Sequence, residues 1–333
     1  MTDVGVALLG LGPWGRNHQR ALTELGALRK VYDVDSAVLE AHADPVHAAA
    51  SLDDVLADPG VAAVVIATPA RTHYSLACEV LAAGKDVLVE KPLTLDEREG
   101  EALVRRSRAA GRVLMVGHVM LYHRAIVCLA ELITGGELGR LRYLYANRLN
   151  FGRVREEEDI LWSFAPHDIA VFLRLTNAWP DSVTAHGGGY LHPDRADVTV
   201  THLDFPGGVR GHIFVSWLHP EKEHRLVVIG DRRMAVFTDD ADGGRLVVSD
   251  GVPPRSGESP PPPRNERVVP FPKSEPLKDE LLHFLHCVRT REEPLSGGRH
   301  GLDVLRVLET AQKSLGRGGH AEPCPAVVQE AEA

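Results

Sequence analysis

The feature that most constrains the fold is a glycine-rich turn near the N-terminus, placed between a strand pattern and a helical pattern. Residues 4–9 are apolar or glycine, and the sequence GLGPWG follows directly at residues 10–15, ahead of a helical stretch. In this context Gly10 permits a tight turn, Gly12 lets a pyrophosphate approach the backbone, and Gly15 lets the helix pack closely on the strand. The unpaired N–H groups at the helix start then face the phosphates. The pattern therefore predicts a dinucleotide-binding βαβ unit.

An acidic residue lies near the end of the second predicted strand. Residues 28–34 have a strand pattern that includes Asp33, eighteen residues after Gly15. A carboxylate at this place accepts hydrogen bonds from both hydroxyls of an adenine ribose and repels a 2′-phosphate. The pattern favours NAD over NADP. The alternative is that Asp33 only caps a turn with Asp35.

Further apolar strands alternate with helical patterns along the first part of the chain. Residues 61–69, 86–89 and 113–116 are predicted strands, and Thr68 and Pro69 end the first of them. Strands that alternate with helices at this spacing predict a parallel sheet with right-handed crossovers. Fully apolar strands also fit a sheet that is covered by helices on both faces.

A lysine follows the strand at residues 86–89, in the sequence Val89-Glu90-Lys91-Pro92. Doubly wound sheets carry their chemistry at the carboxyl ends of the strands. Lysine is much rarer than arginine in this chain, and only lysine can lose its proton and act as a general acid or base. The alternative is a solvated loop lysine paired with Glu90.

These motifs, in this order and at this spacing, resemble those of the Gfo/Idh/MocA oxidoreductase family over nearly the whole chain. The resemblance implies an α/β protein with two domains. One is an NAD-binding Rossmann domain with a doubly wound parallel sheet, at residues 1–119. The other is a substrate-binding and oligomerisation domain with a large, open, mostly antiparallel sheet, at residues 120–333, whose last helices pack back near the Rossmann domain. The residues predicted to contact the cofactor are Gly10, Gly12, Pro13, Trp14, Gly15, Asp33, Thr68, Pro69, His73, Glu90 and Lys91.

A polar pair, His167-Asp168, follows the mostly apolar residues 161–166 and is predicted to open an otherwise apolar helix that continues through Leu175. The segment resembles the second signature of the family, in which a histidine faces the substrate near the lysine. His167 takes that position, and the resemblance implies that Lys91 and His167 are the catalytic residues. The family pattern has an aspartate four residues earlier, where this chain has Ser163. Asp168 is expected to orient His167 or to bind a sugar hydroxyl; the alternative for His167 is a structural role.

Other polar residues of the second domain are candidates for substrate binding. Arg148 and Arg155 are expected to grip an anionic group, because an arginine fork matches phosphate or carboxylate geometry. The alternative is a solvated surface. A polar cluster at residues 217–222 is a further candidate. The residues predicted to bind substrate are Arg148, Asn150, Arg155, Trp162, Asp168, His219 and Lys222.

The resemblance implies an NAD(H)-dependent oxidoreductase that acts on a secondary alcohol, or the matching ketone, of a sugar or nucleotide-linked sugar in a biosynthetic pathway. Two alternatives remain open. One is a dehydrogenase of cyclitols such as inositol, and the other is a regulator that binds NAD and sugar on the same scaffold without catalysis.

Composition narrows the class of protein. The chain of 333 residues has a net charge of −9, which argues against nucleic acid or an anionic membrane as a partner. Its four cysteines are scattered, without CxxC, which fits a reducing cytoplasm and argues against a structural zinc site. A metal site at His283 and His286 is a minor alternative. No apolar run reaches the roughly 18 residues of a membrane span, and the N-terminus lacks the pattern of a signal peptide.

From residue 182 the pattern has a period of two residues, which predicts antiparallel strands joined by short turns. One face of such a sheet packs on helices, and the other needs a cover. The simplest cover is a second copy of the chain, so we expect a homodimer or homotetramer through the open face. The proline-rich stretch 251–266 is predicted to be a mobile loop.

Overall fold

The computed structural model describes residues 4–152, 154–156, 158–240, 243–251 and 265–324. The chain divides into two compact units: unit 1 contains Met1–Tyr122 and Ser274–Leu305, and unit 2 contains His123–Lys273 and Arg306–Ala333. The assignment of NAD binding to residues 1–119 and of substrate binding to residues 120–333 stays a prediction. Most of the proline-rich stretch 251–266 lies outside the described residues.

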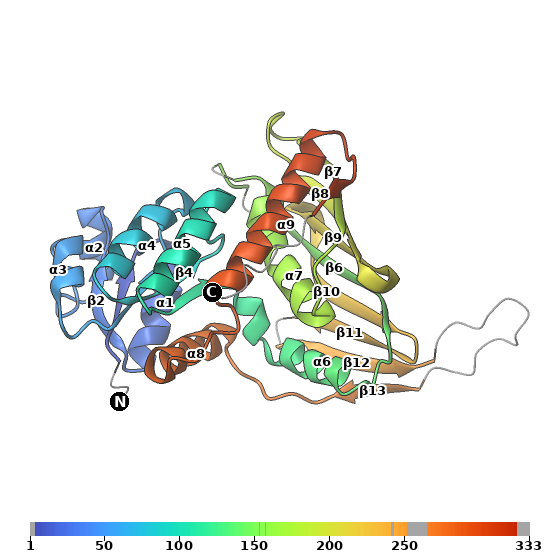
Figure 1. Ribbon diagram of the computed structural model, residues 1–333, viewed down its shortest axis with the longest axis horizontal. Helices are drawn as coiled ribbons and strands as arrows, with labels where there is room; N and C mark the ends of the chain where they lie inside the picture. Colours follow the sequence, from blue (N-terminus) through green and yellow to red (C-terminus); the bar gives the residue numbers. More distant parts are fainter. Residues whose placement is uncertain (1–3, 153, 157, 241–242, 252–264, 325–333) are drawn as a thin grey trace, which may run out of the picture. The chain divides into compact units, whose positions relative to one another are not determined.

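Unit 1 is built on a five-stranded parallel sheet with the order β2-β1-β3-β4-β5 (Figure 1). The chain runs from β1 to one neighbour and then to β3 on the other side of β1. This reversal creates the place where doubly wound sheets bind ligands, at the carboxyl ends of the strands. The predicted sheet is therefore confirmed. The strands are β1 (Val6–Leu9), β2 (Leu28–Tyr32), β3 (Ala63–Ile66), β4 (Asp86–Glu90) and β5 (Leu114–Gly117).

Helices cover both faces of this sheet. The α-helices that contribute to unit 1 are α1 (Pro13–Glu24), α2 (Ser36–His42), α3 (Leu52–Ala57), α4 (His73–Ala82), α5 (Glu97–Ala109), α8 (Pro276–Thr290) and the first part of α9 (Gly298–Gly316); two 3₁₀ turns are η1 (Ala70–Thr72) and η2 (Val119–Tyr122). The sequence did not predict α2. Its first turn is capped by Asp35, whose side chain accepts a hydrogen bond from the backbone N–H of Ala37.

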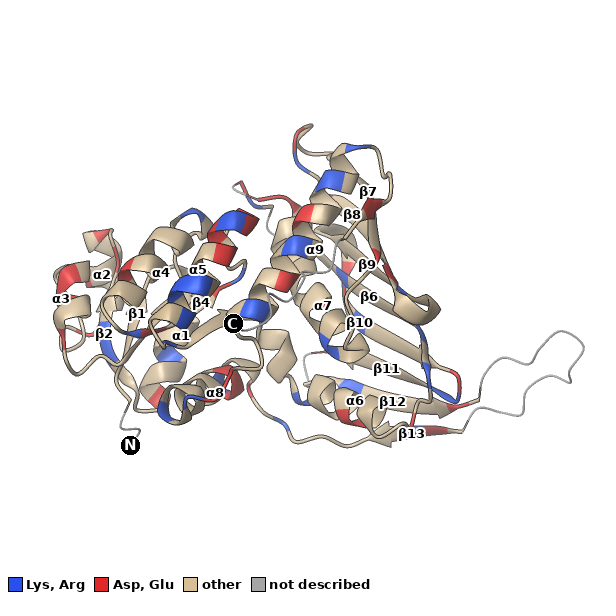
Figure 2. Ribbon diagram, in the orientation of Figure 1, with Lys and Arg blue, Asp and Glu red and all other residues tan. Residues whose placement is uncertain are grey.

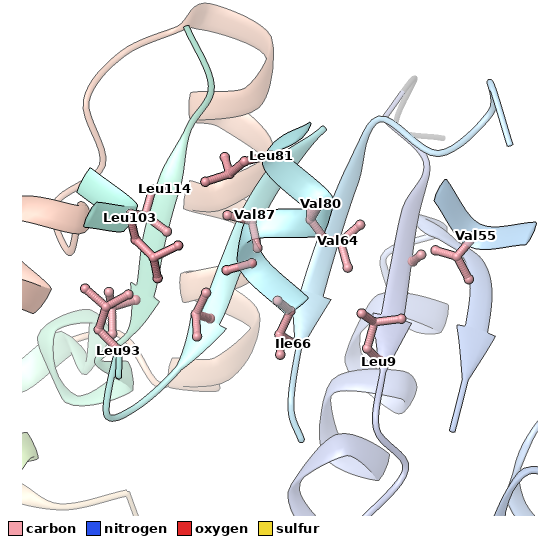
Figure 3. Packing of buried hydrophobic residues seen from close by; sticks show 14 of the residues in the cluster. Leu9, Val55, Val64, Ile66, Val80, Leu81, Val87, Leu93, Leu103 and Leu114 are labelled. Atoms are coloured by element: carbon pink, nitrogen blue, oxygen red, sulfur yellow. The ribbon is translucent and has the colours of Figure 1, made fainter. Parts of the chain in front are cut away.

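The core of unit 1 lies between one face of the sheet and the helices α3, α4 and α5 (Figure 3). Leu9 and Ile66 come from neighbouring strands, Val80 comes from α4 and Leu103 from α5, and all four are fully buried or nearly so. Burying a side chain of this kind stabilises a fold by about 1.5–3 kcal/mol. The charged residues of unit 1 lie mainly on its helices, as on α5, whereas β1, β3 and β5 carry none (Figure 2). This division explains why the sheet was predictable from sequence.

Unit 2 contains a nine-stranded sheet with the order β13-β12-β11-β10-β6-β9-β8-β7-β14. The pair β6–β9 is parallel and the other pairs are antiparallel, which confirms the predicted large, mostly antiparallel sheet. The strands are β6 (Leu141–Phe151), β7 (Ser182–Gly188), β8 (Val198–Phe205), β9 (Val209–Ser216), β10 (Leu218–Gly230), β11 (Arg233–Asp239), β12 (Arg245–Asp250), β13 (Glu266–Val269) and β14 (Glu322–Pro323).

Helices α6 (Arg124–Thr134) and α7 (Ile160–Thr176) lie on one face of this sheet, and the 3₁₀ turn η3 (Pro206–Gly208) joins β8 to β9 (Figure 1). On the helix side, Leu144 of β6 and Ile213 of β9 are fully buried. On the opposite side, Tyr145 and Phe214 of the same strands are only half-buried. Among the described residues, no helix covers this second face of the sheet. No helix among the described residues has the length and apolarity needed to cross a membrane.

Strand β10 is longer than its sequence predicts. The apolar pattern begins near residue 225, but the strand begins at Leu218 and includes the polar sequence HPEKEH at residues 219–224. Its polar half pairs with the end of β6, with an irregular register between Leu218 and Glu223. The pairing of backbone groups with β6, and not burial of side chains, therefore sets the start of this strand.

Candidate active site

The glycine-rich loop of unit 1 has the shape that a pyrophosphate requires. Gly10 has φ of 94°, which favours glycine. A Cβ atom on Gly15 would lie 2.0 Å from the carbonyl oxygen of Gly10, so the helix start can approach the loop only with glycine there. A Cβ on Gly12 would meet no atom within 4 Å, which leaves open space beside the backbone. Gly12 caps α1 without a side-chain hydrogen bond, and Pro13 occupies the first turn. The loop therefore fits the phosphates of a dinucleotide.

Asp33 lies directly after β2 and beside this loop. Its Oδ2 accepts a hydrogen bond of 2.7 Å from the backbone N–H of Leu11, and its Oδ1 accepts one of 3.0 Å from that of Asp35. The turn contact with Asp35 that we considered as an alternative is thus present. It does not exclude ribose binding, because each carboxylate oxygen can accept more than one hydrogen bond.

Glu90 is a buried carboxylate that accepts several hydrogen bonds at the site in unit 1. Its carboxylate accepts hydrogen bonds from Trp14 Nε1, from His18 Nε2 at 2.7 Å and from the backbone N–H of Lys91 at 3.1 Å. Burial raises the pKa of Glu90, but the hydrogen bonds from His18 and Trp14 outweigh burial and hold that pKa below its usual value. Glu90 therefore joins the start of α1 to the end of β4.

Lys91 is half-buried and follows β4, and the peptide bond between Lys91 and Pro92 is cis. His73 is 1% exposed, and its ring nitrogens lie 2.8 Å from the carbonyl oxygen of Pro92 and 2.9 Å from that of Thr68. Burial lowers the pKa of His73, and the neutral ring has one N–H that donates to one of these oxygens. The geometry gives His73 a positioning role, because its ring links the turns after β3 and β4. Direct contact of His73 with the cofactor stays a prediction.

In unit 2, α7 carries His167 and Asp168. The predicted helix start at His167 was wrong, because the helix begins directly after Asp159. The Asp159 side chain caps it by accepting a hydrogen bond of 3.0 Å from the backbone N–H of Trp162. Asp168 is buried and pairs with Arg148 of β6 through two hydrogen bonds, Nε to Oδ2 at 2.8 Å and Nη2 to Oδ1 at 3.0 Å. This pair joins α7 to β6. The half-buried His167 directly precedes Asp168 in the sequence.

The Arg148–Asp168 pair changes the expectation for both residues. We expected the guanidinium fork of Arg148 to hold an anionic substrate group, and the fork holds a carboxylate of the protein itself. We also expected Asp168 to bind a sugar hydroxyl or to orient His167, and its two oxygens accept from Arg148. Substrate binding by either residue stays a prediction. The geometry favours a structural role for the pair, which holds α7 in place on β6.

The remaining predicted substrate residues have separate surroundings. Trp162 donates from Nε1 to Gln312 Oε1 at 2.9 Å. Arg155 is exposed and pairs with Glu158 at 3.2 Å, while Asn150 is half-buried near the end of β6. Binding of substrate by these three predicted residues stays a prediction.

The polar cluster at residues 217–222 lies at the beginning of β10. His219 Nδ1 lies 2.8 Å from the carbonyl oxygen of Glu221, and Lys222 is exposed. Leu218 pairs with Phe151, so this cluster begins beside the end of β6.

In the part of the chain that the structure describes, no group of three or more His, Cys, Asp or Glu side chains could hold a metal ion. His283 Nε2 lies 3.0 Å from the backbone nitrogen of Leu295, which donates to it. His286 pairs with Glu292 at 3.0 Å. The two histidines thus have different partners.

Sequence reasoning missed three residues near the cofactor half of the site. These are His18, which binds Glu90, His118, which follows β5, and His300, whose ring contacts that of His118. One signal was available: Trp14 and His18 are four residues apart on a helix and so lie on one face. The contact between His118 and His300 had no such signal, because it joins distant parts of the chain.

Comparison with known proteins places the chain in a family. Residues 4–118 match the model of the oxidoreductase family with an NAD-binding Rossmann fold, and residues 126–236 match that of the GFO/IDH/MocA C-terminal domain. UDP-N-acetylglucosamine 3-dehydrogenase of Acidithiobacillus ferrooxidans is 29% identical over 313 residues, which are 92% of this chain and 95% of that protein. A solved structure of that enzyme has a TM-score of 0.83 at 26% identity and covers 96% of this chain and 99% of its own.

Two further proteins support the same placement. scyllo-Inositol 2-dehydrogenase (NAD(+)) of Bacillus subtilis is 28% identical over 246 residues, which are 68% of this chain and 72% of that protein. The structure of an oxidoreductase from Magnetospirillum magnetotacticum is 30% identical with a TM-score of 0.80, over 93% of this chain and 99% of its own. The chain therefore belongs to the Gfo/Idh/MocA family of NAD-binding oxidoreductases.

Proposed function

We propose that the protein is an NAD-dependent enzyme that oxidises a secondary alcohol of a nucleotide-linked sugar, or reduces the matching ketone, in the cytoplasm. One observation carries the proposal. The glycine-rich loop, Asp33 and Lys91 all follow strands at the carboxyl edge of one parallel sheet, and Glu90 joins the loop to the lysine. Doubly wound sheets bind dinucleotides at this edge.

Each residue has a distinct task in this mechanism. The start of α1 and the open space at Gly12 bind the pyrophosphate, and Asp33 binds the ribose hydroxyls. Bound NAD supplies the acceptor for the hydride. Lys91 removes the hydroxyl proton during oxidation and returns it during reduction, while Glu90 fixes the backbone of the lysine. His167 donates a hydrogen bond to the same substrate oxygen or shares the proton transfer.

The substrate class rests on the relatives. The match to UDP-N-acetylglucosamine 3-dehydrogenase covers nearly the whole of both chains, whereas the match to scyllo-inositol 2-dehydrogenase covers about two thirds of this chain. This difference favours a nucleotide-linked sugar over a cyclitol. The exposed cations Arg155 and Lys222 in unit 2 fit a substrate that carries phosphate. A cyclitol is the second candidate.

The test follows the near-ultraviolet absorbance of reduced nicotinamide when the protein and NAD meet UDP-N-acetylglucosamine, sugar phosphates, free sugars and inositols. Lys91→Ala is expected to lower turnover by roughly 10²–10⁴-fold and to leave NAD affinity nearly unchanged. Lys91→Arg is expected to be equally slow, because arginine keeps the charge but cannot give up its proton. Lys273→Ala, at an exposed lysine of unit 2, is the matched control.

The outcomes separate the alternatives. Full turnover in Lys91→Ala would remove Lys91 from the mechanism. A signal with inositol alone would favour the cyclitol dehydrogenase, and NAD binding without turnover of any sugar or ketosugar would favour a regulator. Arg155→Ala is expected to weaken substrate binding without changing NAD affinity if the substrate is anionic.

We also propose that the protein forms a homodimer or homotetramer through the open face of the nine-stranded sheet. Apolar side chains lie on that face, including Tyr145, Phe214, Val236 and Val268, and Val268 is 54% exposed. A surface of this kind favours association with a copy of itself. Analytical ultracentrifugation is the test, and a monomer at all concentrations would contradict the proposal.

A further inference from the structure

Four charged or titratable side chains form a row across the helix-covered face of the sheet in unit 2. His224 of β10 is opposite Arg148 of β6 on one side and opposite Asp239 of β11 on the other. Residues directly opposite each other on neighbouring strands point to the same face of a sheet. Asp168 of α7 joins them through its two hydrogen bonds to Arg148. We call these four residues the polar row.

The polar row lies beside apolar side chains of the same face. Two residues along each of the three strands, this face carries Ala146, Leu226 and Phe237, and all three are buried. The helix-covered face thus changes from apolar to charged at the row. A polar group is costly in apolar surroundings unless it has a partner. A few polar groups at the border of an apolar surface are typical of a site for a small molecule.

One end of the row adjoins the histidine that we propose as a substrate contact. Asp168 directly follows His167 in α7, so the row starts one residue away from His167. The other end lies close to the start of α6, because the ring of His123 at this helix start lies 4.8 Å from that of Phe237 on β11. The polar row and His167 therefore lie in one part of unit 2.

His224 and Asp239 are the accessible members of the row. Their side chains are 18% and 26% exposed, and Nδ1 of His224 lies 3.5 Å from Oδ2 of Asp239. Nδ1 is itself enclosed and has no hydrogen-bond partner among the described residues. A neutral imidazole that turns its Nδ1–H toward a carboxylate presents Nε2 as an acceptor. The exposed part of the pair therefore offers acceptors: the ring nitrogen Nε2 and the carboxylate.

The charges of the row do not suit an anionic ligand. The fork of Arg148 is occupied by Asp168 through Nε and Nη2. His224 holds the pKa of Asp239 below its ordinary value, and the charges of His123 and Arg148 lower it further, although burial opposes them. With a neutral imidazole the row contains two carboxylates and one guanidinium, so its net charge is negative. Hydroxyl donors fit such a surface, whereas a further carboxylate is repelled.

We propose that His224 and Asp239 bind hydroxyl groups of the sugar and select a neutral sugar over a uronate. Nε2 of His224 accepts a hydrogen bond from one hydroxyl, and the carboxylate of Asp239 accepts one from a neighbouring hydroxyl. This inference rests on the proposed function, because it concerns the same substrate. It narrows the substrate class to nucleotide-linked sugars whose ring carries hydroxyls and no carboxylate.

The first test measures binding and needs no turnover. Isothermal titration calorimetry of the protein with NADH follows UDP-N-acetylglucosamine and the analogue in which the primary alcohol of the sugar is a carboxylate. Wild type is expected to bind the neutral sugar at least about tenfold more tightly. A uronate that binds as tightly as the neutral sugar, or more tightly, would overturn the selection by charge.

The second test compares variants of the two residues. Asp239→Asn and His224→Gln are each expected to lower the affinity for the neutral sugar roughly tenfold and to leave NADH affinity unchanged. Asp239→Asn is also expected to narrow the preference over the uronate, because the repelling charge is gone. Asp181→Asn, at an exposed aspartate of unit 2, is the matched control, and thermal unfolding verifies that each variant is folded.

The outcomes separate this inference from the proposed function. If both variants bind the neutral sugar as wild type does while Lys91→Ala is slow, the inference fails and the proposed function stands. If wild type neither binds nor turns over a nucleotide-linked sugar, the proposed function fails and the inference fails with it.

Discussion

Replacing Glu280 with glutamine is expected to stabilise the protein at neutral pH. Glu280 lies in α8 and is 0% exposed, and neither of its carboxylate oxygens has a hydrogen-bond partner among the described residues. Burial raises its pKa well above the ordinary value, and the negative charge of Glu90 raises it further. Because Glu90 has hydrogen-bond donors and Glu280 has none, Glu90 carries the charge and Glu280 carries a proton in the folded state.

The sign of the pH dependence follows from this difference. Glutamate in the unfolded chain has a pKa of about 4.3 and loses its proton above that pH, whereas the folded state keeps the proton. The contribution of Glu280 to stability is therefore complete below pH 4.3 and is lost as the pH rises toward the folded pKa. Each pH unit in this window lowers the free energy of unfolding by about 1.36 kcal/mol. Between pH 5 and pH 7 the loss reaches up to about 2.7 kcal/mol.

Glu280→Gln removes the titration and keeps the shape of the side chain. Urea unfolding of both proteins at pH 5, 6 and 7 is the assay, with Glu40→Gln at an exposed position of α2 as the control. The difference in unfolding free energy between the variant and wild type is expected to grow with pH. A constant difference over this range would refute the assignment of a buried, protonated Glu280.

Three further predictions concern the site. Asp168→Asn leaves the charge of Arg148 buried without its ion pair and is expected to lower the free energy of unfolding by about 3–5 kcal/mol, measured by urea unfolding; a loss below about 1 kcal/mol would contradict this. Gly15→Ala places a methyl group against the carbonyl of Gly10 and is expected to weaken NAD binding at least about tenfold by calorimetry, whereas unchanged affinity would mean that the loop can shift. Asp33→Ala removes the charge that repels a 2′-phosphate, so the ratio of NADP to NAD affinity is expected to rise, and an unchanged ratio would show that other residues set the preference.

The sequence was a good guide to the parallel sheet because β1, β3 and β5 are short runs without charged residues, and β4 has an apolar centre. The sequence also located the glycine-rich loop, Asp33 and Lys91, because each of them comes directly after a strand. It was less successful where a residue's role depends on a partner far along the chain. Contact of Glu90 with the cofactor stays a prediction, but the hydrogen bonds that its oxygens accept from Trp14 and His18 were not predicted.

Unit 2 shows the same limit. Arg148 and Asp168 are twenty residues apart, and no periodicity indicates that they form a buried pair. Local patterns also did not indicate that α8, which comes late in the sequence, belongs to the unit of the N-terminal sheet; only the family resemblance implied that the last helices pack back there. Contacts of this kind are set by packing between distant segments, and local sequence patterns do not predict them.

The two edge strands of the nine-stranded sheet affect the behaviour of the protein at high concentration. An open edge exposes unpaired backbone groups, which can recruit a strand from another molecule. At one edge, β14 has only two residues, and one of them is Pro323, which has no N–H to donate. At the other edge, β13 is four residues long and carries the exposed charges of Glu266 and Arg267. Both edges therefore resist the addition of further strands, which protects the sheet against growth into fibrous aggregates while its broad open face stays available for ordered assembly.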